Sequence, residues 1–165
     1  MEANFRDVLK SIQQYKPVPW DMIPDLGLYM DQVITFITRM YEPLYGDQTV
    51  GYLSAPMINN YVKSKLIPRP TGKKYSREQI ALLAMIVALK QVSSMEDIRV
   101  MLTPADGMTI EQLYTQFCAR QQHVVSQLSE LGRDEDSGLS PAMDFAIVAS
   151  GYRAGCEAML KATPH

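Results

Sequence analysis

Apolar residues near the N-terminus recur at intervals of three and four, the spacing of one face of a helix. The first set predicts a short helix over residues 4–15, and a second set predicts a long helix from about Leu26 to the Gly46-Asp47 turn. Between them, residues 16–24 hold three prolines, which fix φ and remove backbone donors, so a non-helical connector is expected. The residues of the two stripes are Phe5, Val8, Leu9 and Ile12, then Met30, Val33, Ile34, Ile37, Met40, Tyr41 and Leu44.

A third helix is predicted over residues 55–65. Ser54 is a suitable N-cap residue, and Pro56 falls in the first turn, where a missing N–H group costs nothing. Pro68 and Pro70 cannot continue a helix, so the element ends before them.

Capping-box spacing, a Ser or Thr followed three residues later by Glu or Gln, predicts the next three helix starts. The pairs are Ser76 with Gln79, Ser93 with Glu96 and Thr109 with Gln112, for helices over 77–91, 94–102 and 110–131.

The C-terminal third predicts a helical hairpin. Residues 110–131 carry a heptad-like seam with one polar member, Gln121, and such a seam requires a partner helix. After an acidic loop at 132–138, Ser140 and Pro141 begin a last helix to about 161 that is apolar nearly all round and is expected to pack on more than one side. The fold expected is therefore all-α, with at most a short β-ribbon over 67–75. The seam consists of Ile110, Tyr114, Phe117, Gln121, Val124, Leu128 and Leu131.

Charge is distributed unevenly along the chain. The net charge is −2, yet residues 57–101 hold eight Lys and Arg against three Asp and Glu. Electrostatic attraction acts over about 8 Å at physiological salt, so a local basic patch attracts phosphate even on an acidic protein. The alternative at this point is a charged face that is merely solvated.

Several functional classes find no support in the residues. No apolar run approaches the length of a membrane span and the N-terminus is not a signal peptide, so a cytoplasmic protein is expected. Cys118 and Cys156 are expected as buried free thiols. His123 and His165 have no partner at metal-ligand or nucleophile spacing, and no glycine-rich phosphate loop is present. No enzyme activity, catalytic residue, metal or cofactor is expected.

The basic segment has the order of a winged helix-turn-helix: helix, turn, helix 55–65, basic hairpin, helix. On helix 55–65 the outward positions suit a major groove, because Asn pairs with adenine and Lys reaches guanine or phosphate. The hairpin lysines and Arg69 would follow the sugar-phosphate backbone, and Tyr75 would either contact a phosphate or attach the hairpin to the next helix. The candidate DNA contacts are Asn59, Asn60, Lys63, Lys65, Arg69, Lys73, Lys74, Tyr75 and Arg77.

Two stretches carry a family resemblance. MINNYVKSKLIPRP from Met57 and KYSREQI from Lys74 resemble the DNA-binding half of the MerR superfamily, with its reading helix, wing and Tyr-Ser cap. More closely, residues 17–102 resemble a bacterial family of unknown function that includes YkrK-like transcriptional regulators. Two positions differ from the MerR pattern: Lys65 stands where glycine is usual, and Asn59 where arginine is common.

The function expected is that of a sequence-specific regulator, a dimeric repressor that binds double-stranded DNA through helix 55–65 and wing 67–75. Residues 1–104 are expected to form the N-terminal helices and the DNA-binding part, and residues 105–165 a helical hairpin of the same compact unit that serves dimerisation or holds an effector. The resemblance favours the dimer, since MerR-type regulators dimerise through helices after the DNA-binding half. The alternative is a protein-interaction adaptor that keeps the winged fold without binding DNA. No small-molecule effector is indicated.

Overall fold

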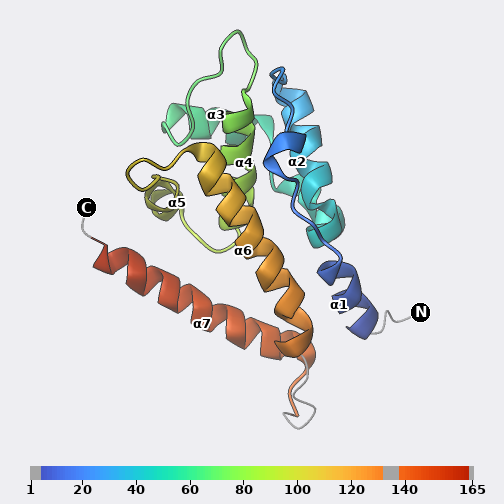
Figure 1. Cartoon of the computed structure of the whole chain (residues 1–165). Helices are drawn as coiled ribbons and strands as arrows, with labels where there is room; N and C mark the ends of the chain where they lie inside the picture. The colour runs from blue at the N-terminus through green and yellow to red at the C-terminus, as the bar shows by residue number, and fades with distance from the viewer. Residues whose placement is uncertain (1–4, 132–137, 164–165) are drawn as a thin grey trace. The chain divides into compact units, whose positions relative to one another are not determined.

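The computed structural model describes residues 5–131 and 138–163. In this part of the chain it contains seven α-helices, as the sequence pattern predicts (Figure 1). Two short 3-10 helices are also present, and the only β-pairing among these residues consists of isolated bridges. The acidic loop expected at 132–138 lies, except for Gly138, outside the described residues. The helices are α1 (Phe5–Gln13), η1 (Trp20–Met22), α2 (Met30–Tyr45), η2 (Gly46–Gly51), α3 (Ala55–Lys63), α4 (Arg77–Leu89), α5 (Met95–Met101), α6 (Ile110–Leu131) and α7 (Pro141–Ala162).

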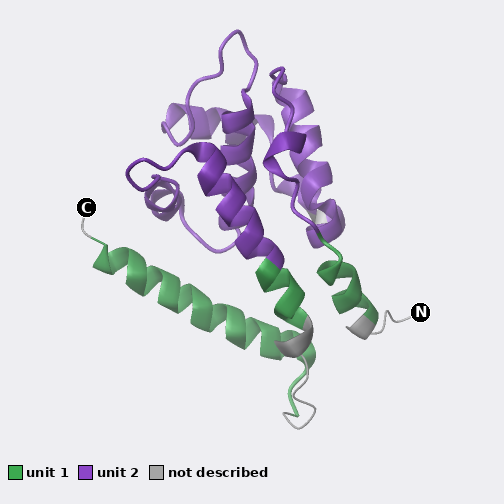
Figure 2. Cartoon of the chain, viewed as in Figure 1, with its two compact units in different colours: residues 1–15, 123–165 green, residues 16–122 purple. Residues whose placement is uncertain are grey.

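The chain divides into two compact units (Figure 2). Unit 2 is continuous and comprises residues 16–122, whereas unit 1 joins residues 1–15 to residues 123–165. The division expected at 104/105 is therefore not where the units separate. The N-terminal helix groups with the C-terminal residues instead of with the basic segment.

Helix α4 supplies the centre of unit 2. Every residue from Gln79 to Val87 is buried, so this helix is covered on all sides by the elements around it. Helix α2 packs on both α3 and α4, and the hydroxyl of Tyr41 donates a 2.7 Å hydrogen bond to the carbonyl oxygen of Ala84 inside this core. Around α4 the buried side chains include Val33, Ile37 and Met40 from α2, Ile58 and Tyr61 from α3, Ile98 from α5 and Tyr114 from α6.

Helix α2 begins at Met30, later than the expected start near Leu26. Gly27 has a positive φ of 75°, and Leu28 makes an antiparallel bridge with Tyr75. Both are incompatible with a helical backbone, so tertiary pairing overrides the apolar pattern of this segment. The helix then continues through Pro43 to Tyr45.

Helix α3 ends in a Schellman motif. The amide of Leu66 donates to the carbonyl of Tyr61 at 2.9 Å, and the amide of Lys65 donates to that of Val62 at 3.0 Å. Lys65 occupies the left-handed position with φ of 59°, where glycine is the usual residue. Leu66 and Tyr61 are both buried and provide the apolar contact typical of the motif. Lys65 therefore adopts the conformation that glycine usually adopts at this position of the motif.

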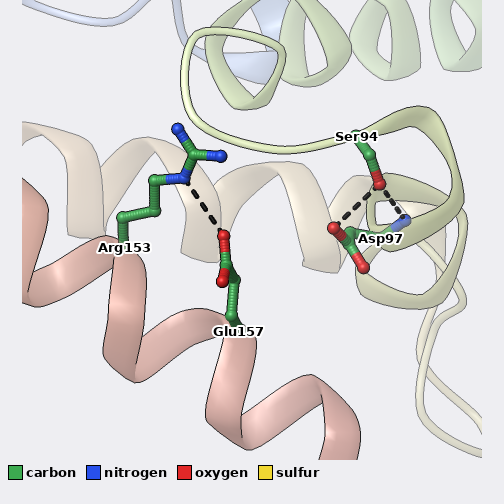
Figure 3. Close-up of polar contacts among 4 residues, drawn as sticks. All are labelled: Ser94, Asp97, Arg153 and Glu157. Carbon is green, nitrogen blue, oxygen red and sulfur yellow. Dashed lines mark hydrogen bonds and ion pairs between the residues drawn. The ribbon is translucent and has the colours of Figure 1, made fainter.

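Two of the three predicted capping boxes are confirmed. The Ser76 hydroxyl accepts from the Gln79 amide, the Gln79 side chain accepts from the Ser76 amide, and Thr109 with Gln112 does the same. The third prediction was wrong by one residue. Ser94, not Ser93, caps α5: its hydroxyl accepts from the Asp97 amide at 3.2 Å and donates to the Asp97 carboxylate at 2.8 Å (Figure 3). Asp97 is therefore the acidic residue at the third helical position, where the prediction placed Glu96.

Unit 1 has few buried side chains in its described residues: Leu9, Tyr15 and Val125. Gln13 donates to the carbonyl of Ser126 at 3.5 Å, which joins α1 to the end of α6. Of the predicted seam, Val124 is 43% exposed in the single chain, whereas its neighbour Val125 is buried.

Helix α7 differs most from expectation. It was expected to be packed on more than one side, yet none of its residues is buried. Large apolar side chains such as Tyr152 and Met159 are 74% exposed. Arg153 and Glu157 form an i, i+4 ion pair, with Arg153 Nε 3.1 Å from Glu157 Oε1 (Figure 3).

Candidate nucleic-acid interface

The basic segment between α3 and α4 contains a tight hairpin turn. Gly72 and Lys73 both have positive φ, 57° and 62°, and the Lys74 amide donates to the Thr71 carbonyl at 3.1 Å. Two central residues with positive φ define a type I′ turn, whose twist suits a β-hairpin. The turn leaves Lys73 and Lys74 exposed at its tip.

The hairpin is attached to the segment that leads into α2. Leu28 and Tyr75 exchange two backbone hydrogen bonds, of 2.8 and 3.1 Å. The Lys74 ammonium lies 5.2 Å from the centre of the Tyr29 ring, within range of a cation–π interaction. A Cβ atom added at Gly27 would lie 3.1 Å from the Cβ of Lys74. The close approach explains why this position requires glycine, and it fixes the hairpin relative to the start of α2.

Helix α3 presents the side chains that the sequence assigned to its outer face. Ile58 and Tyr61 are buried, while Asn59, Asn60 and Lys63 are exposed. The Nδ2 atom of Asn60 lies 3.7 Å from the Sδ atom of Met95 on α5, so this amide has a weak partner already. The Asn59 amide has no hydrogen-bond partner in the described part of the chain.

Helix α5 holds the C-terminal end of α3. The Arg99 guanidinium donates to the carbonyl oxygens of Ser64, at 2.7 Å, and Lys65, at 3.3 Å. A cation there satisfies carbonyls that have no helical partner and opposes the negative end of the helix dipole. Nothing in the local sequence marks Arg99 for this role, because its partners lie 34 and 35 residues earlier in the chain.

Five of the predicted basic contacts are exposed and make no ion pair with any described residue. They are Lys63, Lys65, Arg69, Lys73 and Lys74, of which Lys74 lies over the Tyr29 ring. They follow one another along the chain, from the last turn of α3 to the tip of the hairpin. Their charge is therefore available to an anionic partner.

Two predicted contacts have other roles. Tyr75 is only 2% exposed, and this burial raises the pKa of its phenol. Its side chain belongs to the core, which agrees with the expectation that it attaches the hairpin and not with a phosphate contact.

Arg77 is half-buried and engaged with the connector before α2. Its Nε atom donates to the Ile23 carbonyl at 2.8 Å, a terminal nitrogen lies 3.5 Å from the Asp25 carboxylate, and the guanidinium lies 5.7 Å from the centre of the Trp20 ring. An arginine with three intramolecular partners gains little from a phosphate, so its role is structural.

The described residues contain no cluster of three or more His, Cys, Asp or Glu side chains suited to a metal ion. Within the same ranges, no helix has the length and apolar character needed to cross a bilayer. Cys118 and Cys156 are free thiols, but half-buried rather than buried as expected. The Cys118 thiol lies 3.9 Å from the Val18 carbonyl oxygen, and burial raises its pKa.

Comparison with known proteins identifies a family. Residues 18–117 match the family described as "Domain of unknown function (DUF1836)", and because the match covers more than half of the chain, the protein belongs to this family. The matched range nearly coincides with unit 2, residues 16–122. No curated protein and no solved structure matches the chain. The residues that match the family therefore lie in the compact unit that carries the basic segment.

Proposed function

We propose that the protein is a sequence-specific DNA-binding regulator, a dimeric repressor, in which α3 enters the major groove and the 67–75 hairpin contacts phosphates. The observation that carries the proposal is the unpaired positive charge on the last turn of α3 and the hairpin. Phosphate contacts supply most of the affinity of such proteins.

The order of elements gives further support. An extended residue, Leu28, pairs onto the hairpin, and α2 and α3 follow it before the chain returns to the hairpin turn. The proposal interprets this order as a winged helix-turn-helix in which α3 is the reading helix. Asn59 and Lys63 on the exposed face of α3 are residue types that recognise base edges.

The exposed apolar residues of α7 support the dimer. Met143, Ile147, Tyr152 and Met159 are each more than half exposed, and isolated soluble domains rarely leave so much apolar surface uncovered. A two-fold dimer formed when a second copy covers α7 would contain two reading helices, and the DNA site of such a dimer is an inverted repeat.

The test is selection of bound duplexes from a random DNA pool by the full chain at near-physiological salt. An enriched inverted repeat, absent when Lys73→Ala/Lys74→Ala is used, supports the proposal. Sedimentation of the same protein measures the dimer, and Ile147→Glu is expected to give monomers. Failure to enrich any sequence would contradict the DNA-binding role.

The second candidate is a protein-interaction adaptor. The same α7 surface favours it, because an uncovered apolar helix also suits a different protein partner. A chain that is monomeric by sedimentation and enriches no DNA sequence would favour the adaptor over the regulator.

A further inference from the structure

A hollow of about 690 Å³ lies between three elements of unit 2, two of which the proposed function assigns to DNA binding. The start of α2 forms one wall, α3 forms a second and the hairpin forms the third. Small-molecule sites usually have volumes of about 300–1,000 Å³. The hollow is thus of ligand size, and no described side chain fills it. Its apolar lining includes Tyr29, Met30, Ile34, Val62, Pro70 and Tyr75.

The lining combines an apolar body with charge at one side. Tyr29 is 49% exposed and lines the hollow together with Ile34 and Val62. Lys73 lines the hollow, and the Lys74 ammonium lies over the Tyr29 ring. Two lysines of the hairpin tip thus lie at this side, while the single acid of the lining is Asp31, on the first turn of α2.

We propose that this hollow is a binding site for a small aromatic anion, whose ring packs against Tyr29, Ile34 and Val62 while its acidic group pairs with the hairpin lysines. Aromatic and aliphatic walls favour a flat apolar body, and an ammonium group beside a desolvated surface favours an anion. The site does not suit a cationic ligand, because Lys73 and Lys74 would repel it.

Occupancy of the hollow affects DNA binding, and this part rests on the proposed function. Asn59 and Lys73 line the hollow and are also proposed DNA contacts. One side chain cannot serve a ligand and a duplex in the same geometry, so the ligand competes with DNA. A competitor at ten times its own dissociation constant lowers the apparent DNA affinity about elevenfold.

The experiment uses 2-naphthoate as the probe and 2-naphthamide, which has the same ring system without the charge, as its control. Amide shifts of the full ¹⁵N-labelled chain are followed without DNA. We expect 2-naphthoate to give saturable shifts at the lining residues and 2-naphthamide to bind more weakly. In Lys73→Gln this difference in affinity between the two probes should be lost. Ile34→Phe, which fills the hollow from α2, should abolish the shifts while the rest of the spectrum reports an intact fold. Ala55→Leu provides the same block from α3 if Ile34→Phe does not fold.

The outcomes separate the site from the proposed function. Three results would each overturn the site, whatever the protein does with DNA. They are no shifts at the lining residues, shifts in both blocking variants equal to those of the parent, and equal binding of 2-naphthamide and 2-naphthoate. If 2-naphthoate binds but leaves the affinity for a selected duplex unchanged, competition is overturned and DNA binding stands. If 2-naphthoate binds and no duplex is ever enriched, the DNA role fails and the ligand site stands.

Discussion

The guanidinium of Arg99 donates to the carbonyl oxygen of Ser64 at 2.7 Å, across 35 residues of sequence. A second bond reaches the carbonyl of Lys65 at 3.3 Å. Through these two bonds α5 determines where α3 ends and how the hairpin leaves it. The orientation of the proposed DNA-binding residues therefore depends on a residue outside the basic segment.

Replacement of Arg99 by alanine is expected to lower the free energy of unfolding by about 1–3 kcal/mol, because two carbonyl groups lose a charged donor. Urea unfolding measures the change. Arg120→Ala, which removes an exposed arginine of α6 from the same unit, is the matched control and should change stability by less than about 0.5 kcal/mol. Equal midpoints for the two variants would show that the Arg99 bonds contribute nothing.

Glycine should have opposite effects at two neighbouring lysines. Lys65 has a φ of 59°, a conformation that strains any residue with a Cβ atom. Lys65→Gly is thus expected to stabilise the fold by about 0.5–1 kcal/mol. Lys63→Gly, at the last residue of α3, should destabilise it by less than about 1 kcal/mol. Thermal unfolding of both variants gives the signs, and a loss of stability in Lys65→Gly would contradict the left-handed assignment.

Gly27→Ala is expected to destabilise the protein by about 1–2 kcal/mol. The residue has a φ of 75°, which costs an L-residue about that much, and its Cβ would approach that of Lys74 to 3.1 Å. Gly51→Ala is the control, since a Cβ there meets nothing within 4 Å. Chemical unfolding compares the pair, and a Gly27→Ala protein as stable as the parent would mean that the hairpin is free to move from α2.

Salt dependence of DNA binding distinguishes phosphate contacts from other roles. Each lost contact should reduce the slope of log K against log salt by about 0.9. The change is expected for Lys63→Ala, Arg69→Ala and Lys73→Ala, and not for Lys161→Ala, a lysine of α7 in the other unit. Titrations of a selected duplex between low and moderate salt provide the slopes. Identical slopes for all four variants would place the phosphate contacts elsewhere.

Stability should fall in mildly alkaline solution because of Cys118. Burial raises its pKa in the folded state, so the unfolded thiol loses its proton first. Stability is complete below the unfolded pKa and decreases as pH rises toward the folded one. Urea unfolding between about pH 7.5 and 9, where tyrosine side chains are still mostly protonated, measures this slope. Cys118→Ala should flatten it and Cys156→Ala should not; an unchanged slope in Cys118→Ala would assign the effect to other groups.

Local signals predicted the helices because they depend on neighbours in sequence. These signals act within one turn of a helix. They include the capping pair Ser76 with Gln79 and the first-turn prolines Pro56 and Pro141, and a helix begins at each of them in the structure. Apolar spacing likewise separated the buried Ile58 and Tyr61 from the exposed Asn59 and Asn60. The sequence by itself thus determined the all-helical class, the element order and the concentration of positive charge after α3.

Only the tertiary structure decided which of those residues remain available to a partner. The Leu28–Tyr75 pairing moved the start of α2 and placed Tyr75 in the core. The connector before α2 occupied Arg77, and α5 contributed Arg99. Each of these contacts joins residues 34 to 54 positions apart. A pattern of period 3.6 carries no information about such pairs, because they depend on how helices pack and not on which residues favour a helix.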